Sequence, residues 1–192
     1  MFQVFPHITS LGLNEQELAF VSRVLGSPHG DRLFRDDGQP ELPLVTDTLT
    51  WLLQTAGYSE TNRRSRLTRI HFHSLSFHLV ATAAGVWLNS VEAVAAGAYA
   101  AGRQACDHKF EPDQLEMRIS PKLKFYSGAT TRQFDSDAPV SEFTHKGYSF
   151  AFSPVLVCLH PEKTVGLGDA ISATGLLYSE FRSDNTGYAE AE

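Results

Sequence analysis

The chain has 192 residues and a formal net charge of −6, and 42% of its residues are hydrophobic and 20% charged. Such a composition is typical of one globular core of ordinary size and argues against a disordered, collagen-like or disulfide-framework protein. The negative charge argues against a nucleic-acid partner, because nonspecific binding to nucleic acid needs a basic face that displaces counterions.

The first half of the chain predicts an alternation of strands and helices. Apolar residues at helical spacing, such as Leu18, Val21 and Leu25, predict amphipathic helices. Alternating aromatic and branched residues predict strands, and a stretch rich in Gly, Pro and Asp predicts a surface loop. In chain order, we expect a strand at 4–12, a helix at 14–25, a loop at 26–43, a helix at 45–56 and one or two strands within 69–84.

The second half continues this alternation. We expect a helix at 89–105, short strands joined by long loops within 107–146, strands at 148–152 and 154–159, a helix at 168–181 and a polar tail at 182–192. Strands that alternate with helices of crossover length favour βαβ units. We therefore predict one layered α/β domain over residues 1–181, with a mainly parallel sheet flanked by helices.

The sequence does not predict a transmembrane helix. Its most apolar run, 91–105, consists mostly of Ala and Gly, whereas a membrane-spanning helix needs about 20 apolar residues. The first ten residues lack the basic region and apolar run of a signal peptide. They lead directly into a predicted strand, so we expect the chain to start inside a longer protein.

The sharpest motif is Gly166-Leu167-Gly168-Asp169, between an apolar strand and an amphipathic helix. Its glycines allow a tight turn whose N–H groups point at an anion, and the helix start adds its positive end. Asp169 is placed to accept the proton of an attacking hydroxyl, which suits phosphoryl transfer. The alternative is an ordinary strand-to-helix turn, since the motif is neither a Walker A loop nor a Rossmann fingerprint.

A second candidate is the pair Asn14 and Glu17, one turn apart at a predicted helix start. Both can face one site, where Glu17 would hold Mg²⁺ directly or through water. The alternative is a helix-capping box with Asn in the place of Ser or Thr. Because the same spacing recurs at Asn89 and Glu92, spacing alone does not decide between the two interpretations.

Histidines and cysteines leave further alternatives open. His71 and His73 share one face of a predicted strand, so they can reach one ligand together. His78 lies nearby, but the further ligands that a metal site needs at short range are not evident, which favours satisfied or surface histidines. Cys106 and Cys158 allow one disulfide, or two buried thiols in a reducing compartment, and do not suffice for a zinc cluster.

Taken together, these segments resemble the ADP-dependent sugar kinases of the ribokinase-like superfamily, and most closely their glucose-phosphorylating animal members. The matching stretches, in chain order, are ITSLGLNEQEL, LTRIHFHSL, AVAAGA, QAC, PVLVC and TVGLGDAIS. Ordered matches over nearly the whole chain are far more specific than either short motif. The resemblance implies a ribokinase-like fold and favours the functional interpretation of both motifs.

The resemblance also implies roles for single residues. Asp169 would be the catalytic base, and Glu17 and Asp169 would hold Mg²⁺. His71 and Val165 would lie on the nucleotide side. The anion hole that binds the phosphate would be formed by Gly166, Leu167, Gly168 and Asn14.

The same resemblance implies the reaction and its setting. ADP would donate a phosphoryl group to the 6-hydroxyl of glucose, giving glucose 6-phosphate and AMP. The complete enzyme would be monomeric, with no nucleic-acid partner. Animal members are associated with the endoplasmic reticulum, so we expect Cys106 and Cys158 to pair in its oxidising lumen.

One departure from the family pattern concerns the part upstream of Asn14. The family has an H-x-E motif before N-x-x-E, whereas His160-Pro161-Glu162 lies near the other end of the chain and is interpreted as coincidence. We therefore expect a C-terminal portion without the N-terminal half and the lid, which transfers phosphate poorly by itself. Two alternatives stay open: an ATP-dependent ribokinase-type sugar kinase, and a non-catalytic nucleotide-binding fragment or truncated gene product.

Overall fold

The computed structural model describes residues 3–29, 33, 38–106, 111–119, 123–127 and 130–183. Its helices are α1 (Glu15–Leu25), α2 (Leu42–Ala56), α3 (Ser90–Ala105) and α4 (Leu167–Tyr178), with 3-10 turns at Phe5–His7 and Pro112–Gln114. Its strands are β1 (Ser10–Leu13), β2 (Arg69–His73), β3 (Phe77–Ala83), β4 (Trp87–Leu88), β5 (Leu115–Arg118), β6 (Lys124–Ser127), β7 (Thr130–Gln133), β8 (Ser141–His145), β9 (Tyr148–Cys158) and β10 (Glu180–Phe181). Among the described residues, no helix is long and apolar enough to cross a membrane. The predicted polar tail lies outside them from residue 184 onward.

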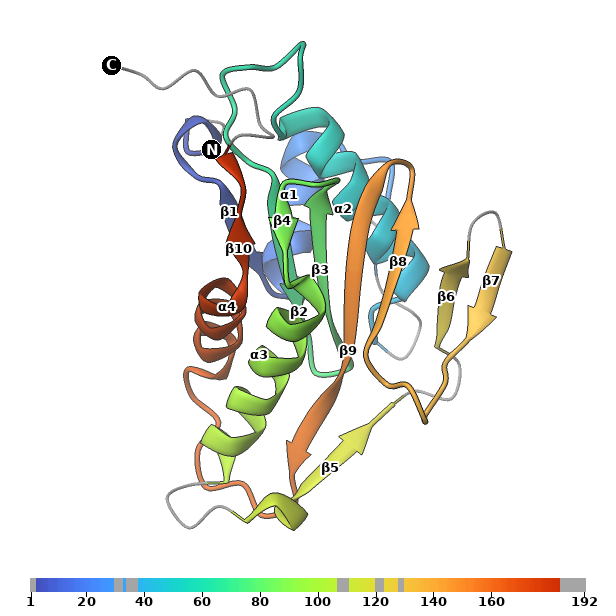
Figure 1. Ribbon diagram of the computed structural model, residues 1–192, viewed down its shortest axis with the longest axis vertical. Coiled ribbons are helices and arrows are strands. Elements are labelled where there is room, and N and C mark those ends of the chain that lie inside the picture. The colour runs from blue at the N-terminus through green and yellow to red at the C-terminus, as the bar shows by residue number, and fades with distance from the viewer. Residues whose placement is uncertain are drawn as a thin grey trace.

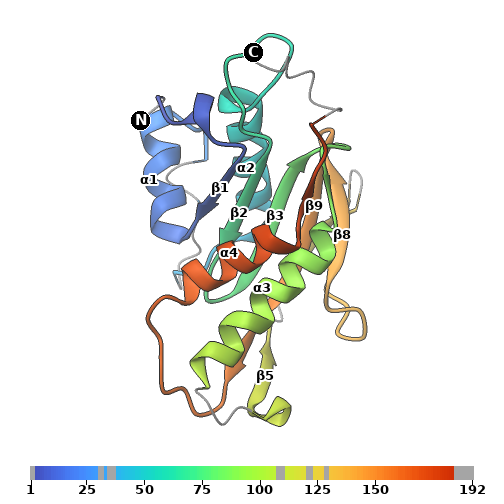
Figure 2. The same ribbon diagram turned by 60° about the vertical axis from the view of Figure 1, so that its left-hand side comes forward.

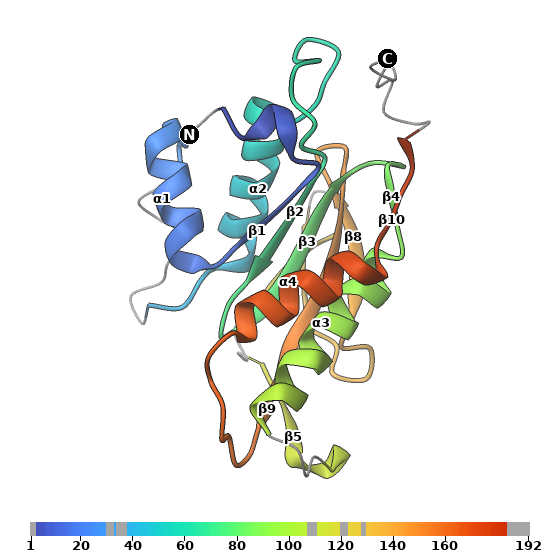
Figure 3. The same cartoon turned by 90° about the vertical axis from the view of Figure 1, so that its left-hand side faces the viewer.

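A six-stranded sheet forms the centre of the fold, with helices on both of its faces (Figure 1). The strand order is β1-β2-β3-β9-β5, and β8 pairs with β9 beside that path. Helices α1 and α2 cover one face, whereas α3 and α4 cover the other (Figures 2 and 3). These layers confirm the predicted α/β class.

The sheet is mixed and mostly antiparallel, so the prediction of a mainly parallel sheet was wrong. Of the described strand pairs in this sheet, β1 and β2 alone run parallel. The reason is the length of the connections. Residues 74–76 join β2 to β3 and residues 146–147 join β8 to β9, and such tight turns link antiparallel neighbours. A parallel pair needs a long crossover, which the segment with α1 and α2 provides between β1 and β2.

Strand β2 presents different side chains to the two helical layers, as the alternation of a strand requires. Ile70 and Phe72 are buried in the large apolar core that also contains residues of α1 and α2. His71 and His73 lie on the opposite face, directly beneath α4. The face of β2 that α4 covers is therefore polar, which is unusual for a buried strand.

Two predicted boundaries differ from the observed ones. The strands expected at 148–152 and 154–159 form one strand, β9. This strand pairs with β3 up to Pro154 and with β5 from Val155 onward, so the residue without an N–H group lies where the partner changes. The helix expected to reach residue 181 ends at Tyr178, because Glu180–Phe181 pairs with β4.

Candidate functional site

The two sequence motifs meet at one edge of the sheet, where β1 and β2 end and α1 and α4 begin (Figure 3). A Cβ atom built on Gly12 of β1 would stand 2.8 Å from the Ser172 hydroxyl oxygen of α4. A Cβ atom built on Gly168 would stand 2.7 Å from Nε2 of His73, the last residue of β2. These close approaches place the start of α4 beside the C-terminal ends of β1 and β2. Helix α1 begins directly after β1.

The turn before α4 is a helix start without a side-chain cap. Gly166 is the N-cap residue and has φ 77°, a left-handed conformation that favours glycine. It offers no side chain to accept the first N–H groups of the helix, which have no intrahelical partner. Asp169 lies in the same first turn. The turn therefore combines N–H donors, the positive end of a helix and a carboxylate.

The loop that leads into this turn is attached to the end of α3. The N–H groups of Glu162 and Lys163 donate to the Ala105 carbonyl oxygen at 2.8 and 3.3 Å. The Gln104 side-chain amide donates to the Val165 carbonyl oxygen at 3.3 Å. The Val165 side chain itself is 87% exposed, so it is accessible to a ligand at this edge.

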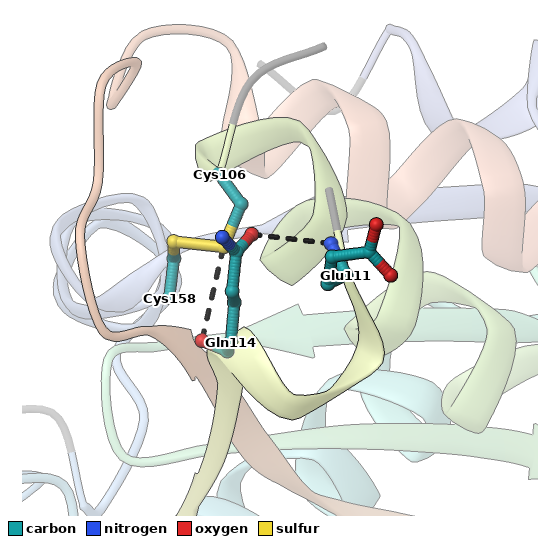
Figure 4. Close-up of a disulfide and its surroundings, with 4 residues drawn as sticks. All are labelled: Cys106, Glu111, Gln114 and Cys158. Carbon is teal, nitrogen blue, oxygen red and sulfur yellow. Dashed lines mark hydrogen bonds between the residues drawn. A yellow bond between two sulfur atoms is a disulfide. The ribbon is translucent and has the colours of Figure 1, made fainter. Parts of the chain in front are cut away.

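A disulfide joins Cys106, directly after α3, to Cys158 at the end of β9 (Figure 4). Their Cα atoms are 5.4 Å apart. The Gln114 carbonyl oxygen lies 3.8 Å from the Cys106 sulfur, and the Gln114 side-chain oxygen accepts the Glu111 N–H at 3.2 Å. The pairing expected from the resemblance is thus present in the structure. The disulfide ties β9, the strand before the loop that leads to Gly166, to α3, the helix whose end holds that loop.

Asn14 and Glu17 form a complete capping box at the start of α1. The Asn14 side-chain oxygen accepts the Glu17 N–H at 2.9 Å, and the Glu17 carboxylate accepts the Asn14 N–H at 2.8 Å. The structural interpretation of this motif is therefore correct. It leaves room for a second role, because one Glu17 oxygen and the Asn14 amide nitrogen take no part in the box.

The similar spacing at Asn89 and Glu92 gives no such box. Asn89 is the N-cap residue of α3 but makes no side-chain capping bond. Its φ of 59° is left-handed, whereas a capping side chain needs an extended backbone at this position. Equal spacing in the sequence therefore corresponds to two different helix starts.

His71 does not lie on a surface that a nucleotide can reach. Its side chain is 0% exposed and lies beneath α4, where a Cβ atom built on Gly175 would stand 2.8 Å from its Cε1 atom. Burial lowers the pKa of His71 well below its ordinary value, so the ring is neutral. This corrects the expectation of a nucleotide-side residue at His71. His73, two residues further along the same face, is the histidine that reaches the site.

His73 connects the two motifs electrostatically. Burial lowers the pKa of His73, and the carboxylates of Glu17, Glu15 and Asp169 act in the opposite direction. The charges that act on this ring therefore come from the first turns of both α1 and α4. Sequence reasoning missed this connection, because it compared His73 only with its neighbour on the same strand.

Ser172 and Gly12 are further parts of the site that sequence reasoning missed. The Ser172 hydroxyl oxygen lies 3.4 Å from Nδ1 of His73. One available signal was its position three residues after Asp169, which places both on one side of the predicted helix. Gly12 had no comparable signal, because its contact with α4 depends on the tertiary fold.

The carboxylates of Glu17 and Asp169 are available for Mg²⁺. In phosphoryl-transfer enzymes this ion is bound by one or two carboxylates together with substrate phosphates and water. Within the described part of the chain, no group of three or more His, Cys, Asp or Glu residues is arranged to hold a metal ion.

Known sequences show where the chain belongs. The conserved region of ADP-specific phosphofructokinase/glucokinase matches residues 1–178. The chain is 45% identical to the ADP-dependent glucokinase of Bos taurus over 192 residues, covering 93% of this chain and 36% of the bovine protein. It is 38% identical to the probable ADP-dependent glucokinase of Caenorhabditis elegans over 188 residues, covering 93% of this chain and 38% of that protein.

Solved structures share the fold. A phosphofructokinase from Pyrococcus horikoshii OT3 with AMP matches at a TM-score of 0.65 and 19% identity, over 91% of this chain and 37% of that chain. An ADP-dependent kinase in complex with fructose-6-phosphate and ADPβS matches at a TM-score of 0.61 and 16% identity, over 91% and 39% of the two chains. These neighbours confirm the ribokinase-like fold. Since the conserved region covers residues 1–178, the chain belongs to the ADP-specific phosphofructokinase/glucokinase family.

Proposed function

We propose that this chain carries the phosphoryl-transfer residues of an ADP-dependent glucokinase, which phosphorylates the 6-hydroxyl of glucose and leaves AMP. The observation that carries the proposal is Asp169 in the first turn of α4, directly after the uncapped turn at Gly166 and near the start of α1. The choice of ADP and glucose rests on the 45% identity to the bovine enzyme. The chain spans 36% of that enzyme, so the proposal concerns the reaction to which these residues contribute.

Asp169 is the proposed general base. As the oxygen of the sugar 6-hydroxyl attacks the β-phosphorus of ADP, its proton passes to the Asp169 carboxylate. The bond from the β-phosphorus to the bridging oxygen breaks, and AMP leaves with that electron pair. A hydroxyl is a poor nucleophile while it keeps its proton, so removal of this carboxylate should remove most of the rate.

The backbone N–H groups of residues 166–168 are the proposed anion hole. Negative charge spreads over the oxygens of the phosphoryl group during transfer, and fixed N–H dipoles at a helix start stabilise it. The Asn14 side-chain amide nitrogen, which takes no part in the capping box, is a further proposed donor. Val165, exposed directly before the turn, is the proposed contact to the nucleotide.

Glu17 and Asp169 are the proposed Mg²⁺ ligands, directly or through water. When bound, Mg²⁺ neutralises charge on the phosphate oxygens. The chain itself fixes the orientation of the Glu17 side chain, because one carboxylate oxygen is held by the Asn14 N–H at 2.8 Å. The other oxygen is thereby kept in a defined position for a ligand.

We further propose that the protein is monomeric and resides in the lumen of the endoplasmic reticulum. The Cys106–Cys158 disulfide supports this compartment, because disulfides persist where the environment is oxidising and are rare in the cytosol. Protease protection in fractionated cells tests the compartment. Complete alkylation of both cysteines in native, non-reduced protein would remove the support.

The reaction is tested by glucose 6-phosphate formation with glucose, Mg²⁺ and either ADP or ATP. We expect transfer from ADP alone, slow in the 192-residue chain, and about 10²–10⁴-fold slower in Asp169→Asn. Glu162→Gln is the matched control, because Glu162 is an exposed carboxylate of the neighbouring loop, within the stretch that mimics H-x-E. This variant should retain the rate of the unaltered chain.

Calorimetric titration with ADP and Mg²⁺ separates binding from turnover. Binding without turnover would support the site and show that the chain lacks the groups that align the sugar. Transfer from ATP but not from ADP would contradict the donor, and full activity in Asp169→Asn would contradict the base. Failure to bind either nucleotide would contradict the proposal for this chain.

A further inference from the structure

The two glycines of the turn before α4 are required for different physical reasons. Gly166 has a positive φ of 77°. Gly168 lies inside α4 and has no such backbone requirement. Position 168 requires a residue without a side chain because of His73. A Cβ atom at Gly168 would stand 2.7 Å from Nε2 and 3.3 Å from Cδ2 of that ring. Protein interiors are close-packed, so the ring and a larger residue at position 168 exclude each other.

His73 also contacts α4 through its other nitrogen. Nδ1 lies 3.4 Å from the hydroxyl oxygen of Ser172, one turn after Gly168. Gly12 of β1 lies against the same hydroxyl, at 2.8 Å from the position of a Cβ atom. The ring is therefore held between β2 and the first turns of α4, with a close contact at each nitrogen.

The same ring lies in the electrostatic field of α1. The Glu17 and Glu15 carboxylates both act on it, as does Asp169. Glu15 in addition accepts the N–H of Leu75 at 3.1 Å, which ties the start of α1 to the turn that follows β2. His73 thus lies against the turn of one motif, and the carboxylate of the other acts on it electrostatically.

We propose that His73 is the positioning residue of the phosphate-binding turn: its ring supports Gly168, engages Ser172, and so sets the turn relative to the Glu17 carboxylate. This rests on the proposed function, in which the turn receives the phosphoryl group. His73 acts through Gly168 and does not touch the reacting atoms. Accurate placement matters, because an error of about 1 Å in a catalytic group can cost about 100-fold in rate.

A double-mutant cycle tests the contact, using Gly168→Ala, His73→Ala and both together in the full chain. In the unaltered chain, Gly168→Ala places a methyl group where the ring already lies. With His73→Ala that space is vacant. We therefore expect Gly168→Ala to lower the thermal midpoint in the first background and to leave it nearly unchanged in the second.

Two measurements test whether His73 positions the turn, because a purely structural role of His73 would not change both of them. These are the backbone amide NMR shifts of residues 166–170 and the calorimetric affinity for ADP with Mg²⁺. We expect His73→Ala to shift these amides and to weaken ADP binding at least about tenfold. His73→Asn keeps a polar atom close to the Nδ1 position and should restore much of both.

Gly175→Ala is the matched control. Its Cβ atom would stand 2.8 Å from Cε1 of His71, the same kind of contact about two turns further along α4. It should lower the thermal midpoint but leave the amide shifts of 166–170 and the ADP affinity unchanged.

Three results would overturn the proposal. The first is a folded His73→Ala variant whose amide shifts at 166–170 are unchanged. The others are a double-mutant cycle in which the effects of Gly168→Ala and His73→Ala simply add, and a Gly175→Ala variant that weakens ADP binding as much as His73→Ala does. A chain that binds no ADP would contradict the proposed function, while the amide shifts would still decide whether His73 positions the turn. If His73→Ala does not fold, Gly168→Ala in the full chain is measured by the same readouts, because its methyl group would displace the ring.

Discussion

At the scale of single residues, two glycines share a left-handed backbone conformation but differ in their setting. Gly166 and Gly26 have φ values of 77° and 74°. Gly26 ends α1, and a Cβ atom there would meet nothing within 4 Å. Gly166 starts α4, with the Gln104 amide nitrogen 3.6 Å from the corresponding position. A substitution at each position therefore separates backbone strain from damage to the site.

We expect Gly166→Ala and Gly26→Ala to lower the free energy of unfolding by similar amounts, about 1–2 kcal/mol, because both force a side chain into the left-handed region. Gly166→Ala alone should also weaken ADP binding, since it displaces the phosphate-binding turn. Urea unfolding and calorimetric titration measure the two effects. Equal loss of ADP affinity in both variants would show that the effect is global.

At the scale of elements, one carboxylate links α2 to the turn between β8 and β9. Asp47 accepts bonds from His145 Nε2 and Lys146 Nζ, each at 2.9 Å. The side chains of Asp47 and His145 are 19% and 11% exposed, so water competes little for their bond. Lys146 itself has φ 47°, which places it in the tight turn.

Asp47→Asn should lower the free energy of unfolding by about 1–3 kcal/mol, because it removes a charged acceptor shared by a largely buried histidine and an exposed lysine. Glu60→Gln is the comparison, since Glu60 and Arg63 form an ion pair that is exposed on both sides. It should have no measurable effect. Denaturant unfolding of both variants measures the difference, and equal effects would show that Asp47 is no more than a surface charge.

The disulfide is the covalent link between elements. It joins the end of α3 to β9 over a sequence separation of 52 residues, which limits the unfolded chain. We expect the Cys106→Ala/Cys158→Ala double variant to lose about 4 kcal/mol of unfolding free energy, the value of the loop-closure relation for such a separation. Denaturant unfolding with and without reductant measures it. A reductant that destabilises the double variant as much as the unaltered chain would contradict this assignment.

The helices could be predicted from the sequence, whereas the direction of the strands could not. Amphipathic spacing located α1 and α2 to within a few residues, because each buries one apolar face, and an Ala-rich run located α3. The residue pattern of a strand indicates which side chains are buried but not which strand it pairs with. The sequence of β2 and β3 therefore did not indicate that they form an antiparallel hairpin. The short pair of β4 and β10 was missed for the same reason.

At the scale of the molecule, the sequence predicted the two motifs but not the ring that joins them. Asp169 and Glu17 were identified from local patterns and from the family resemblance. His73 lies about 100 residues from Asp169 in sequence and reaches the turn beside it only through the packing of α4 on β2. A histidine beneath a helix has no periodic or spacing signature, so only the tertiary structure reveals it.

Buried polar side chains of β2 and β3 form a row on the face of the sheet that α3 and α4 cover. Burial lowers the pKa of His78 to about 3 and that of His71 well below its ordinary value. Arg69 lies in the same row; it donates to the Ser10 hydroxyl at 2.8 Å and lies 5.6 Å from the Trp87 ring. Burial lowers the pKa of this guanidinium to about 10, and it remains charged. The two histidines are neutral at pH 7.

This row predicts that acid destabilises the whole fold. An unfolded histidine binds a proton below about pH 6.5, whereas folded His78 stays neutral to about pH 3. Between these values the unfolded state binds more protons, so the free energy of unfolding falls as pH falls, by about 1.4 kcal/mol per pH unit for each such histidine. Above about pH 7 both states are neutral, and the histidines add no pH dependence.

Urea unfolding between pH 7.5 and 4.5 measures this slope. We expect His78→Gln, which cannot gain the proton, to have a slope lower by about 1.4 kcal/mol per pH unit in the acidic part of the range. Gly26→Ala, destabilised without any change in titratable groups, should keep the slope of the unaltered chain. The carboxylates titrate in all three proteins, so the difference between slopes belongs to His78. Identical slopes in all three would mean that His78 takes up its proton in the folded state, in which case this row is open to water.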